Sequence, residues 1–474
     1  MSKTIEVRNP RTGKYDYVII PPPAKLLAQQ CHRIRRAQKN WQELGIGNRA
    51  IAIKQWKKEI LANKDKILEA LIIDTGRLAI SELELDLLIN NIDRWCNLAP
   101  KILEDTTTET GVPFITLQQT AVPYPLVGVI SPWNFPLLLA MINTIPALLA
   151  GCAVIVKPSE IAPRFVAPLV NSLSQIPHLK DVLNFVEGAG ETGADLIDNV
   201  DMVCFTGRIA TGKKVAQAAA KRFIPACLEL AAKNPAIVLE SADLELAASA
   251  IVWGAVFNSG QSCSAIARIY VAQSILEEFI AKLVTKAKRL QLAYPNLESG
   301  DIGPIISEKQ AAIISDHLLD ARDLGAVLHC GGEIEDYGGA WWCRPTVLSQ
   351  VNHDMKVMTE ETFAPILPVM AFSDISQGIE LANDSIYGLS AAIFAGSDTQ
   401  ALEVAQQINA GAISINDAAL TTLIHEGENN AFNFSGMGNS ATGAAGLTRF
   451  LRKKAFLVKN QPINDPWWFN NLSC

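Results

Sequence analysis

The sequence predicts an α/β protein with two Rossmann-like parallel-sheet α/β domains and a small β arm. Its 474 residues exceed the roughly 250–300 residues at which a single hydrophobic core stops growing. From residue 126 onward, short apolar, β-branched runs alternate with helical segments, as in parallel sheets with crossover helices. The Thr-rich segment 106–123 comes before this alternation. It predicts a hairpin that projects from the body, with a turn near residues 111–113.

The elements follow in order along the chain. Residues 26 to about 103 predict helices, because apolar side chains recur there at near-helical spacing. Strand candidates come next, and a second unit with its own alternation begins near Asn234. The strand candidates are residues 127–130, 152–156, 182–186, 202–205, 236–239, 267–271, 346–348, 366–369, 391–394 and 413–415.

Composition excludes several classes of function. The net charge of −7 argues against nucleic acid as the main partner, because nucleic-acid binding needs a basic face. The nine cysteines are scattered without a CxxC pair, which fits reduced thiols and predicts a cytoplasmic protein. The first eight residues contain no apolar segment, so we expect no signal peptide. No His/Cys cluster has ligand spacing, so we expect no metal.

One stretch could be mistaken for a membrane span. Residues 110–156 carry no charged side chain, and much of the stretch is apolar. A spanning helix needs about 20 predominantly apolar residues, but five prolines between residues 123 and 146 interrupt this stretch. We therefore expect a buried strand, a loop, a buried helix and a second strand, and no transmembrane segment.

The strongest chemical signal is Cys263, which ends the run FNSGQSC at residues 257–263. A free cysteine is usually a small buried apolar residue. The Gly260–Gln261 pair just before this one suggests instead a tight loop that presents a thiol. A reactive thiol also needs a lowered pKa. We predict that Cys263 is a nucleophile and that the other cysteines, which lack this context, are structural.

Two further residues complete a covalent mechanism, in which a thiol attacks a carbonyl carbon and a carboxylate later activates water. Glu229 has apolar neighbours that favour a raised pKa and a role as the base. The alternative is an ion pair with Lys221 or Arg222. Asn134 follows a predicted strand, and its amide can donate to an oxyanion beside the backbone N–H of Cys263. The alternative for this asparagine is a turn cap before a helix.

Five motifs form one ordered pattern: PWNFP at 132–136, KPSE at 157–160, FTG at 205–207 with Gly212, the run ending at Cys263, and EETFAP at 360–365. In this order, from about Asn9 to about Leu451, the chain resembles the aldehyde dehydrogenase superfamily. The resemblance implies NAD(P)-dependent oxidation of an aldehyde to its carboxylic acid through a cysteine thiohemiacetal and a thioester. It assigns 1–105 and 124–232 to an NAD(P)-binding domain, 233–430 to a catalytic domain, and 106–123 with 431–474 to an oligomerisation arm and C-terminal tail.

The resemblance implies NAD as the cofactor, with NADP as the alternative. In the family, lysine at the position of Lys157 reaches the adenine ribose. Glu160 would hold the ribose hydroxyls and repel a 2′-phosphate; the alternative is a surface ion pair between the two. Arg208 replaces a serine in a glycine turn that would bind phosphate, and it would either pair with the pyrophosphate or crowd it. The residues assigned to the cofactor are Ser131, Pro132, Trp133, Lys157, Ser159, Glu160, Gly190, Phe205, Thr206, Gly207, Arg208, Leu230, Glu361 and Phe363.

The substrate is expected to be a small-molecule aldehyde. The helix after Asn134 lines the family's entry tunnel, and this chain lacks the arginine that semialdehyde oxidisers place there. We therefore expect an apolar aliphatic, aromatic or apocarotenoid-type aldehyde. The alternative substrate is a semialdehyde such as succinate semialdehyde. The alternative for the leucines of this helix is that they belong simply to the core. The residues assigned to the substrate are Leu138, Met141, Ser262 and Ser264.

Several positions depart from the family pattern. Ala231–Ala232 stand where two glycines usually follow the base, Ala364 replaces another glycine, and residues 429–432 do not match the expected motif. These departures keep open a catalytically weakened binding protein on the same fold. A different enzyme class, a thioesterase or an NTPase, is a further alternative. The NTPase is considered because residues 207–214 nearly spell a P-loop. By resemblance, the protein would be a homodimer or homotetramer.

Overall fold

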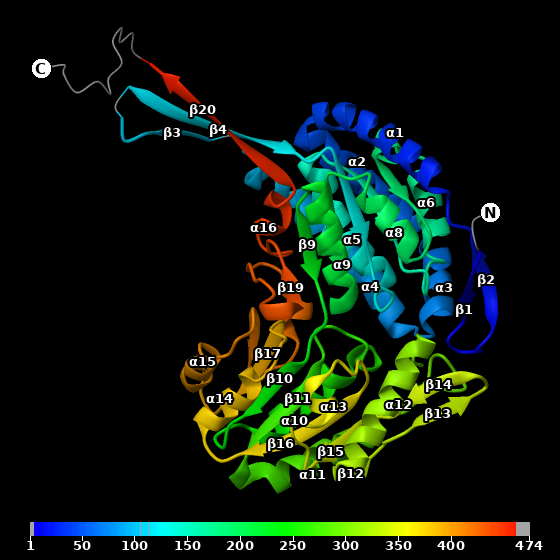
Figure 1. Ribbon diagram of the computed structural model, residues 1–474, viewed down its shortest axis with the longest axis vertical. Coiled ribbons are helices and arrows are strands. Elements are labelled where there is room, and N and C mark those ends of the chain that lie inside the picture. Colours follow the sequence, from blue (N-terminus) through cyan, green and yellow to red (C-terminus); the bar gives the residue numbers. More distant parts are fainter. Residues whose placement is uncertain (1–3, 105, 113, 461–474) are drawn as a thin grey trace, which may run out of the picture.

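Two α/β domains are stacked along the long axis of the molecule, and a narrow sheet projects from the first one (Figure 1). The structure is a computed structural model that describes residues 4–104, 106–112 and 114–460. The described chain begins with a hairpin of β1 (Ile5–Arg8) and β2 (Tyr15–Ile19). The predicted α/β class, with one largely parallel sheet in each domain, is confirmed.

A six-stranded sheet forms the centre of the first domain, in the order β19-β9-β8-β5-β6-β7. Its strands are parallel except β19, which pairs antiparallel with β9 at one edge. The sequence predicted four of these strands and missed the two at that edge. The bounds are β5 (Leu126–Ile130), β6 (Ala153–Lys157), β7 (Leu183–Phe185), β8 (Met202–Thr206), β9 (Ala226–Glu229) and β19 (Gly436–Met437).

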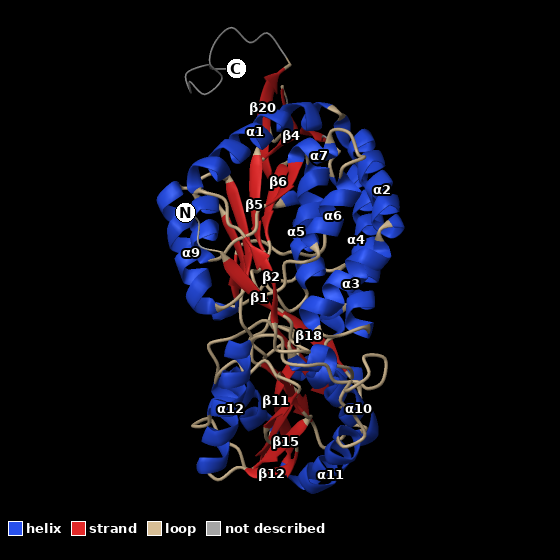
Figure 2. Ribbon diagram, turned by 90° about the vertical axis from the view of Figure 1, so that its right-hand side faces the viewer, coloured by secondary structure: helices blue, strands red, loops and turns tan. Residues whose placement is uncertain are grey.

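Helices cover both faces of this sheet (Figure 2). The four long helices between residues 24 and 102 confirm the helical prediction for this part of the chain. The bounds are α1 (Ala24–Glu43), α2 (Gly45–Ala62), α3 (Lys64–Thr75), α4 (Ala79–Ile102), α5 (Pro136–Ala150), α6 (Val166–Leu173), α7 (Leu179–Val182), α8 (Gly190–Ile197), α9 (Ile209–Arg222) and α16 (Ala445–Thr448).

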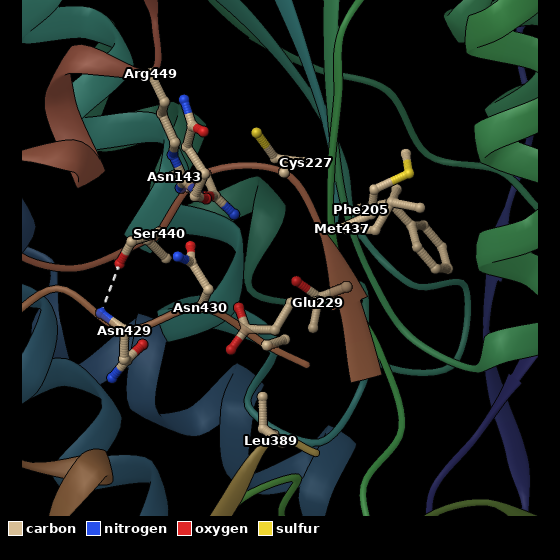
Figure 3. Close-up of a pocket in the computed structure, with 16 residues that line it drawn as sticks. Asn143, Phe205, Cys227, Glu229, Leu389, Asn429, Asn430, Met437, Ser440 and Arg449 are labelled. Carbon is tan, nitrogen blue, oxygen red and sulfur yellow. Dashed lines mark hydrogen bonds between the residues drawn. The ribbon is translucent and has the colours of Figure 1, made fainter. Parts of the chain in front are cut away.

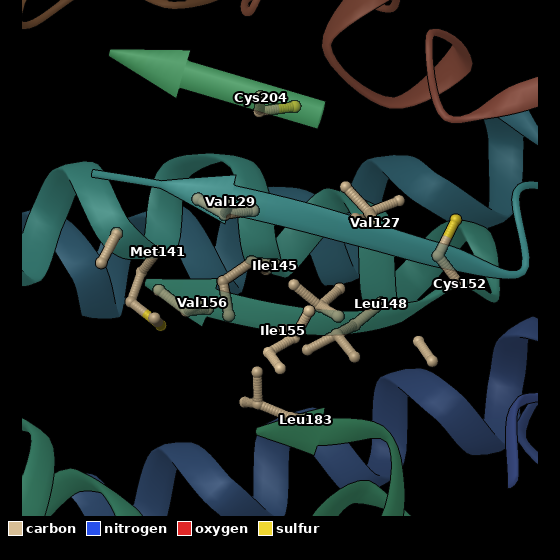
Figure 4. Packing of buried hydrophobic residues seen from close by; sticks show 14 of the residues in the cluster. Val127, Val129, Met141, Ile145, Leu148, Cys152, Ile155, Val156, Leu183 and Cys204 are labelled. Atoms are coloured by element: carbon tan, nitrogen blue, oxygen red, sulfur yellow. The ribbon is translucent and has the colours of Figure 1, made fainter. Parts of the chain in front are cut away.

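Helix α5 explains the charge-free stretch of sequence. It begins at Pro136, and its side chains at Met141, Ile145 and Leu148 pack with Val156 of β6 in the core (Figure 4). Burying a large aliphatic side chain contributes about 1.5–3 kcal/mol, so an apolar helix between two apolar strands is stable here. The predicted strand–helix–strand order is therefore confirmed. In the described ranges, no helix combines the length and the apolar character that crossing a membrane requires.

The second domain contains a seven-stranded sheet in the order β12-β15-β16-β11-β10-β17-β18, parallel except for β12. The strands predicted after residue 234 are present. The strand bounds are β10 (Asn234–Val238), β11 (Ile266–Ala272), β12 (Val327–Cys330), β15 (Thr346–Ser349), β16 (Ile366–Phe372), β17 (Ser390–Phe394) and β18 (Ala412–Ile415), with a separate hairpin of β13 (Ile334–Tyr337) and β14 (Ala340–Cys343). The helices are α10 (Leu244–Val256), α11 (Leu276–Ala287), α12 (Glu308–Asp323), α13 (Lys356–Thr359), α14 (Ile375–Asn383) and α15 (Asp398–Ala405), and the 3₁₀ turns are η1 (Phe257–Gly260), η2 (Gln273–Ile275), η3 (Leu420–Thr422) and η4 (Asn433–Ser435).

The arm is an antiparallel sheet in the order β20-β4-β3. β3 (Thr106–Glu109) and β4 (Ile115–Pro123) form the predicted hairpin, and β20 (Leu451–Lys459) pairs along the whole of β4. The sequence analysis grouped residues 431–474 with the arm, but residues 436–437 return to the first domain and pair with β9. The aromatic tail segment 466–469 lies outside the described residues.

Candidate active site

Cys263 follows a tight loop between α10 and β11. Asn258, Ser259 and Gly260 adopt left-handed backbone angles, with φ of 57°, 56° and 71°, a conformation that is uncommon outside glycine. A side chain at Gly260 would come within 2.1 Å of the Ala364 backbone. The tight loop predicted from the sequence is therefore present, and glycine is required at its closest approach.

Buried hydrogen bonds hold this loop in place. Gln261 is fully buried; its Nε2 donates to the Pro304 carbonyl at 3.1 Å, and its Oε1 accepts from the Ile306 N–H at 3.0 Å. The Asn234 side chain donates to the Cys263 carbonyl at 2.7 Å. Breaking a satisfied buried hydrogen bond is costly, so the thiol has a fixed position.

The environment of the half-buried Cys263 thiol opposes its ionisation. Burial raises the pKa of this thiol to about 12, and the negative charge of Glu229 acts in the same direction. A hydrogen bond with Ser264 lowers the pKa, but by less than burial raises it. The lowered pKa that the sequence analysis required is therefore not found, and the thiolate is a minor species at neutral pH.

Asn134 lies in the loop between β5 and α5, on the same cavity as Cys263. Its backbone carbonyl accepts hydrogen bonds from Arg77 at 3.1 Å and from Asn258 at 3.0 Å. Its side-chain amide donates to the Gln261 carbonyl at 3.1 Å. Because an amide nitrogen carries two N–H groups, a second donor remains for an oxyanion.

Glu229 ends β9, between β8 and β19, and lines a second cavity of about 470 Å³ (Figure 3). We call this the polar cavity; Cys263 does not line it. Burial raises the pKa of Glu229, as predicted, and the positive charge of Arg449 lowers it. The cation that acts on this carboxylate is therefore Arg449, rather than Lys221 or Arg222.

The two alanines after Glu229 are anchored. The Ala232 N–H donates to the Glu361 carboxylate at 3.0 Å, and the Ser435 hydroxyl donates to the Ala231 carbonyl at 2.9 Å. Both alanines are buried. The segment after Glu229 is thus held by hydrogen bonds from both sides.

The cavity beside Cys263, which we call the thiol cavity, has a volume of about 460 Å³. The rings of Trp133 and Phe363 meet edge to face across 5.6 Å, and burial raises the pKa of Glu361 to about 6. Leu139, which lies on the helix expected to line the entry tunnel, also lines the thiol cavity, and so does Gln310, which was not assigned from the sequence. The assigned residues that line the thiol cavity are Pro132, Trp133, Asn134, Thr206, Gly207, Arg208, Leu230, Cys263, Glu361 and Phe363.

The remaining residues assigned to the cofactor do not line the thiol cavity. Lys157 is buried, and its Nζ lies 3.4 Å from the half-exposed Glu160 carboxylate, so this pair is not an ordinary surface ion pair. Burial lowers the pKa of Lys157, and Glu160 raises it. Ser159 is buried next to this pair in sequence. The others are Ser131, whose N–H donates to the Lys157 carbonyl at 3.0 Å, Gly190 at the start of α8, and Phe205 on the polar cavity.

Arg208 precedes α9 and links the two domains. Its Nη2 donates to Gln310 Oε1 at 2.6 Å, and Gln310 Nε2 donates to the Thr362 carbonyl at 2.7 Å. No side chain caps the start of α9, where the Thr211 N–H donates to the Arg208 carbonyl at 3.1 Å. A helix start without a side-chain cap can face a phosphate, which fits a dinucleotide at this wall. Lys213 lies over the Phe434 ring at 4.6 Å, which does not favour a P-loop.

The residues assigned to the substrate have different surroundings. Leu138 and Leu139 are half-buried on one face of α5, and Leu139 lines the thiol cavity. Met141 is fully buried and packs in the core (Figure 4), so its assignment to the substrate is corrected. Ser264 hydrogen-bonds Cys263, whereas Ser262 is buried on a neighbouring cavity. Among the described residues, no group of three or more His, Cys, Asp and Glu could hold a metal ion.

Comparisons with known proteins agree with this geometry. A family model described as "Aldehyde dehydrogenase family" matches residues 1–456. The solved structure of "Putative Aldehyde Dehydrogenase PutA" from Anabaena variabilis matches with a TM-score of 0.98 at 68% identity, covering 99% of this chain and 100% of that one.

Two curated relatives carry more specific names. The 4,4'-diapolycopene aldehyde oxidase of Methylomonas sp is 36% identical over 478 residues, which cover 98% of this chain and 88% of the relative. A "Putative succinate-semialdehyde dehydrogenase (NADP+)" of Mycolicibacterium smegmatis is 33% identical over 412 residues, which cover 86% of this chain and 79% of the relative.

Proposed function

The chain belongs to the aldehyde dehydrogenase family, and on this premise we propose that it oxidises an apolar aldehyde to the carboxylic acid with NAD. It is an oxidoreductase that acts on aldehydes with a nicotinamide cofactor. The observation that carries the proposal is the meeting of Cys263 and Asn134 at one cavity, with Glu229 close enough to influence the thiol.

Cys263 attacks the aldehyde carbon after losing its proton to water, and a carbon–sulfur bond forms. The electron pair of the carbonyl moves to its oxygen, and the resulting oxyanion accepts hydrogen bonds from the Asn134 amide and the Cys263 N–H. Such donors are typically worth about 3–4 kcal/mol of the barrier. When bound, a nicotinamide cofactor would supply the hydride acceptor for oxidation of the thiohemiacetal to the thioester.

Glu229 completes the reaction as a general base. It takes a proton from a water molecule that attacks the thioester carbon, and the carbon–sulfur bond breaks to release the carboxylic acid. Its buried carboxylate, with a raised pKa, suits a base that works near neutral pH. Because Glu229 is present, we propose hydrolysis rather than transfer of the acyl group to coenzyme A.

NAD rather than NADP is proposed because Glu160 is an anion beside the position for the adenine ribose. Lys157 and Glu160 would hold the ribose, and the uncapped start of α9 would face the pyrophosphate. One relative carries NADP+ in its name, so the preference needs a test. Glu160→Ser should raise kcat/KM with NADP relative to NAD by about tenfold or more, as expected from removing one nearby negative charge. An unchanged ratio would contradict the assignment.

An apolar substrate is proposed from the surroundings of the thiol. Leu138, Leu139 and Ile142 are half-buried on one face of α5. Phe257, at the start of the cysteine loop, stacks on Phe135 at 5.7 Å. An apolar face recognises an apolar chain, which is consistent with the relative named for a diapolycopene aldehyde. The relative named for succinate semialdehyde supplies the competing substrate.

A dehydrogenase assay of the pure protein tests the proposal. NADH formation is measured at about 340 nm with a panel of medium-chain, aromatic, apocarotenoid and succinate semialdehyde substrates, each with NAD and NADP. The apolar aldehydes should have the higher kcat/KM. Much faster turnover of succinate semialdehyde would refute the substrate class, and no turnover of any aldehyde would favour a weakened binding protein.

Assembly through the arm and a cytoplasmic location are further parts of the proposal. β20 is an edge strand that exposes Phe456 and Leu457, at 46% and 72%, and exposed apolar edges favour pairing between subunits. We therefore expect a homodimer or homotetramer, and Leu457→Lys should lower the mass measured by light scattering. The cysteines of the described part are all free thiols, as a reducing cytoplasm would keep them.

A further inference from the structure

The polar cavity that Glu229 lines has no role in the reaction as described so far. Its wall combines β9 with Asn143 of α5, the loops 429–431 and 437–441, and Arg449, which follows α16 (Figure 3). The side-chain amides of Asn143, Asn429, Asn430 and Asn439 lie on this wall, and such groups can hold water in hydrogen-bonded positions. The cavity is therefore a site where water can lie next to the Glu229 carboxylate.

Arg449 is the cation of this cavity. Its side chain is 8% exposed; Nη2 donates to the Asn143 side chain, and Nη1 donates to the Asn439 carbonyl at 3.4 Å. Its buried Nε has no partner in the described part of the chain. A buried guanidinium is costly unless an anion compensates its charge, and Glu229 is the carboxylate that lines the same cavity.

The charges around Glu229 are few. Arg449 acts on it across the cavity and lowers its pKa, against the effect of burial. The same guanidinium helps to lower the pKa of Cys227, whose largest cause is a hydrogen bond with Cys204 on β8. The titratable and charged groups that face this region from the packed elements are Cys204, Cys227, Cys263, Glu361 and Arg449.

We propose that Arg449 is a positioning residue for Glu229: from the wall of the polar cavity it keeps the carboxylate ionised for its role as the base. This inference rests on the proposed role of Glu229 as the base of thioester hydrolysis. Arg449 lines the polar cavity but not the thiol cavity, so we expect it to affect hydrolysis and to leave formation of the thioester unchanged.

The test compares Arg449→Gln, which keeps a donor for Asn143 but removes the charge, with Arg449→Lys, which keeps the charge. A burst of NADH reports thioester formation, and the steady rate after the burst reports hydrolysis. In Arg449→Gln the burst should persist, while the steady rate falls about tenfold at neutral pH and its acidic limb moves up by about one pH unit. Arg449→Lys should restore most of the rate and the acidic limb.

Arg452→Met is the matched control, because Arg452 is an exposed arginine of β20 whose guanidinium lies over Tyr124 at 5.1 Å, outside the polar cavity. It should leave both phases unchanged. If Arg449→Gln fails to fold, Asn143→Asp provides the second variant. It keeps Arg449 but neutralises its charge locally, so the acidic limb should again move upward.

Two results would overturn the proposal. One is an acidic limb that stays in place in both Arg449→Gln and Asn143→Asp. The other is a variant whose sole defect is a higher KM for succinate semialdehyde, which would make Arg449 a binding site for the substrate carboxylate. Failure of the underlying role of Glu229 looks different, because Glu229→Gln would then leave the steady rate unchanged. If the inference alone fails, Glu229→Gln slows the steady rate and the Arg449 variants do not.

Discussion

The two sides of the catalytic centre are built in different ways. On the thiol side, the left-handed loop and the buried Gln261 hold Cys263 in a position that local sequence motifs specify. On the carboxylate side, Ala231–Ala232 replace the usual glycines, and Arg449 faces Glu229 across a polar cavity. The position of Cys263 therefore depends on a local backbone geometry, whereas the surroundings of Glu229 depend on Glu361, Ser435 and Arg449, which lie far from it in the sequence.

Cys263→Ala should have the largest effect on activity. It removes the atom on which both half-reactions depend, so kcat should fall on the order of 10⁶-fold, the scale found when a covalent nucleophile is lost. The measurement is NADH formation with a medium-chain aldehyde. Cys330→Ala, which changes a half-buried thiol of the second domain, serves as control and should keep full activity.

Glu229→Gln should separate thioester formation from hydrolysis. The amide cannot accept the proton from water, so steady turnover should fall about 10²–10⁴-fold, while the initial burst of NADH remains. Because the base works only when ionised, wild-type steady turnover should also decrease as the pH drops through the raised pKa of Glu229. Rapid-mixing absorbance measures both phases. Loss of the burst itself would show that Glu229 also acts in thioester formation.

The pH dependence of the burst tests the protonation state of the Cys263 thiol. Burial raises the pKa of Cys263 to about 12, so the thiolate fraction should increase about tenfold for each pH unit in the neutral range. The burst rate of the wild-type protein should follow it. A burst rate that is flat between about pH 6.5 and about pH 8.5 would mean that the thiol is already ionised in the complex with cofactor.

Ala231→Gly should have the smallest effect and concerns the carboxylate side. Restoring the usual glycine loosens the segment after Glu229, so hydrolysis should accelerate a few-fold while the burst is unchanged. The extra freedom of the unfolded chain should lower the free energy of unfolding by about 0.4–1 kcal/mol. Denaturant melts and the steady rate measure both effects. A slower steady rate would show that the alanine is needed for alignment.

Much of the fold could be predicted because strands buried on both faces appear as continuous apolar runs. β9 was missed because it is short and ends in the charged Glu229, and β19 because two residues form no pattern. Cys263 and Asn134 could be singled out because their motifs are local, and the structure places both on one cavity. Arg449 could not be singled out, because it meets Glu229 through folding alone, far along the chain.

Within one helix, the sequence shows which residues lie close together on the helix surface, but not whether they point toward a tunnel or toward the core. Leu138 and Met141 lie three residues apart, yet Leu138 is half-buried and Met141 is in the core. The choice between tunnel and core depends on the rotation of α5 against the sheet, which tertiary packing determines. Leu139, which lines the thiol cavity, would have been selected if that rotation had been known.

The pairing of β19 with β9 has a consequence for biosynthesis. Proteins emerge from the ribosome amino end first, and early segments fold while later ones are still being made. The partners of the cysteine loop are translated by residue 364, but Gly436 and Arg449 come near the end of a chain of 474 residues. A nascent or prematurely terminated polypeptide would therefore display an assembled nucleophile before the wall around its hydrolytic partner exists.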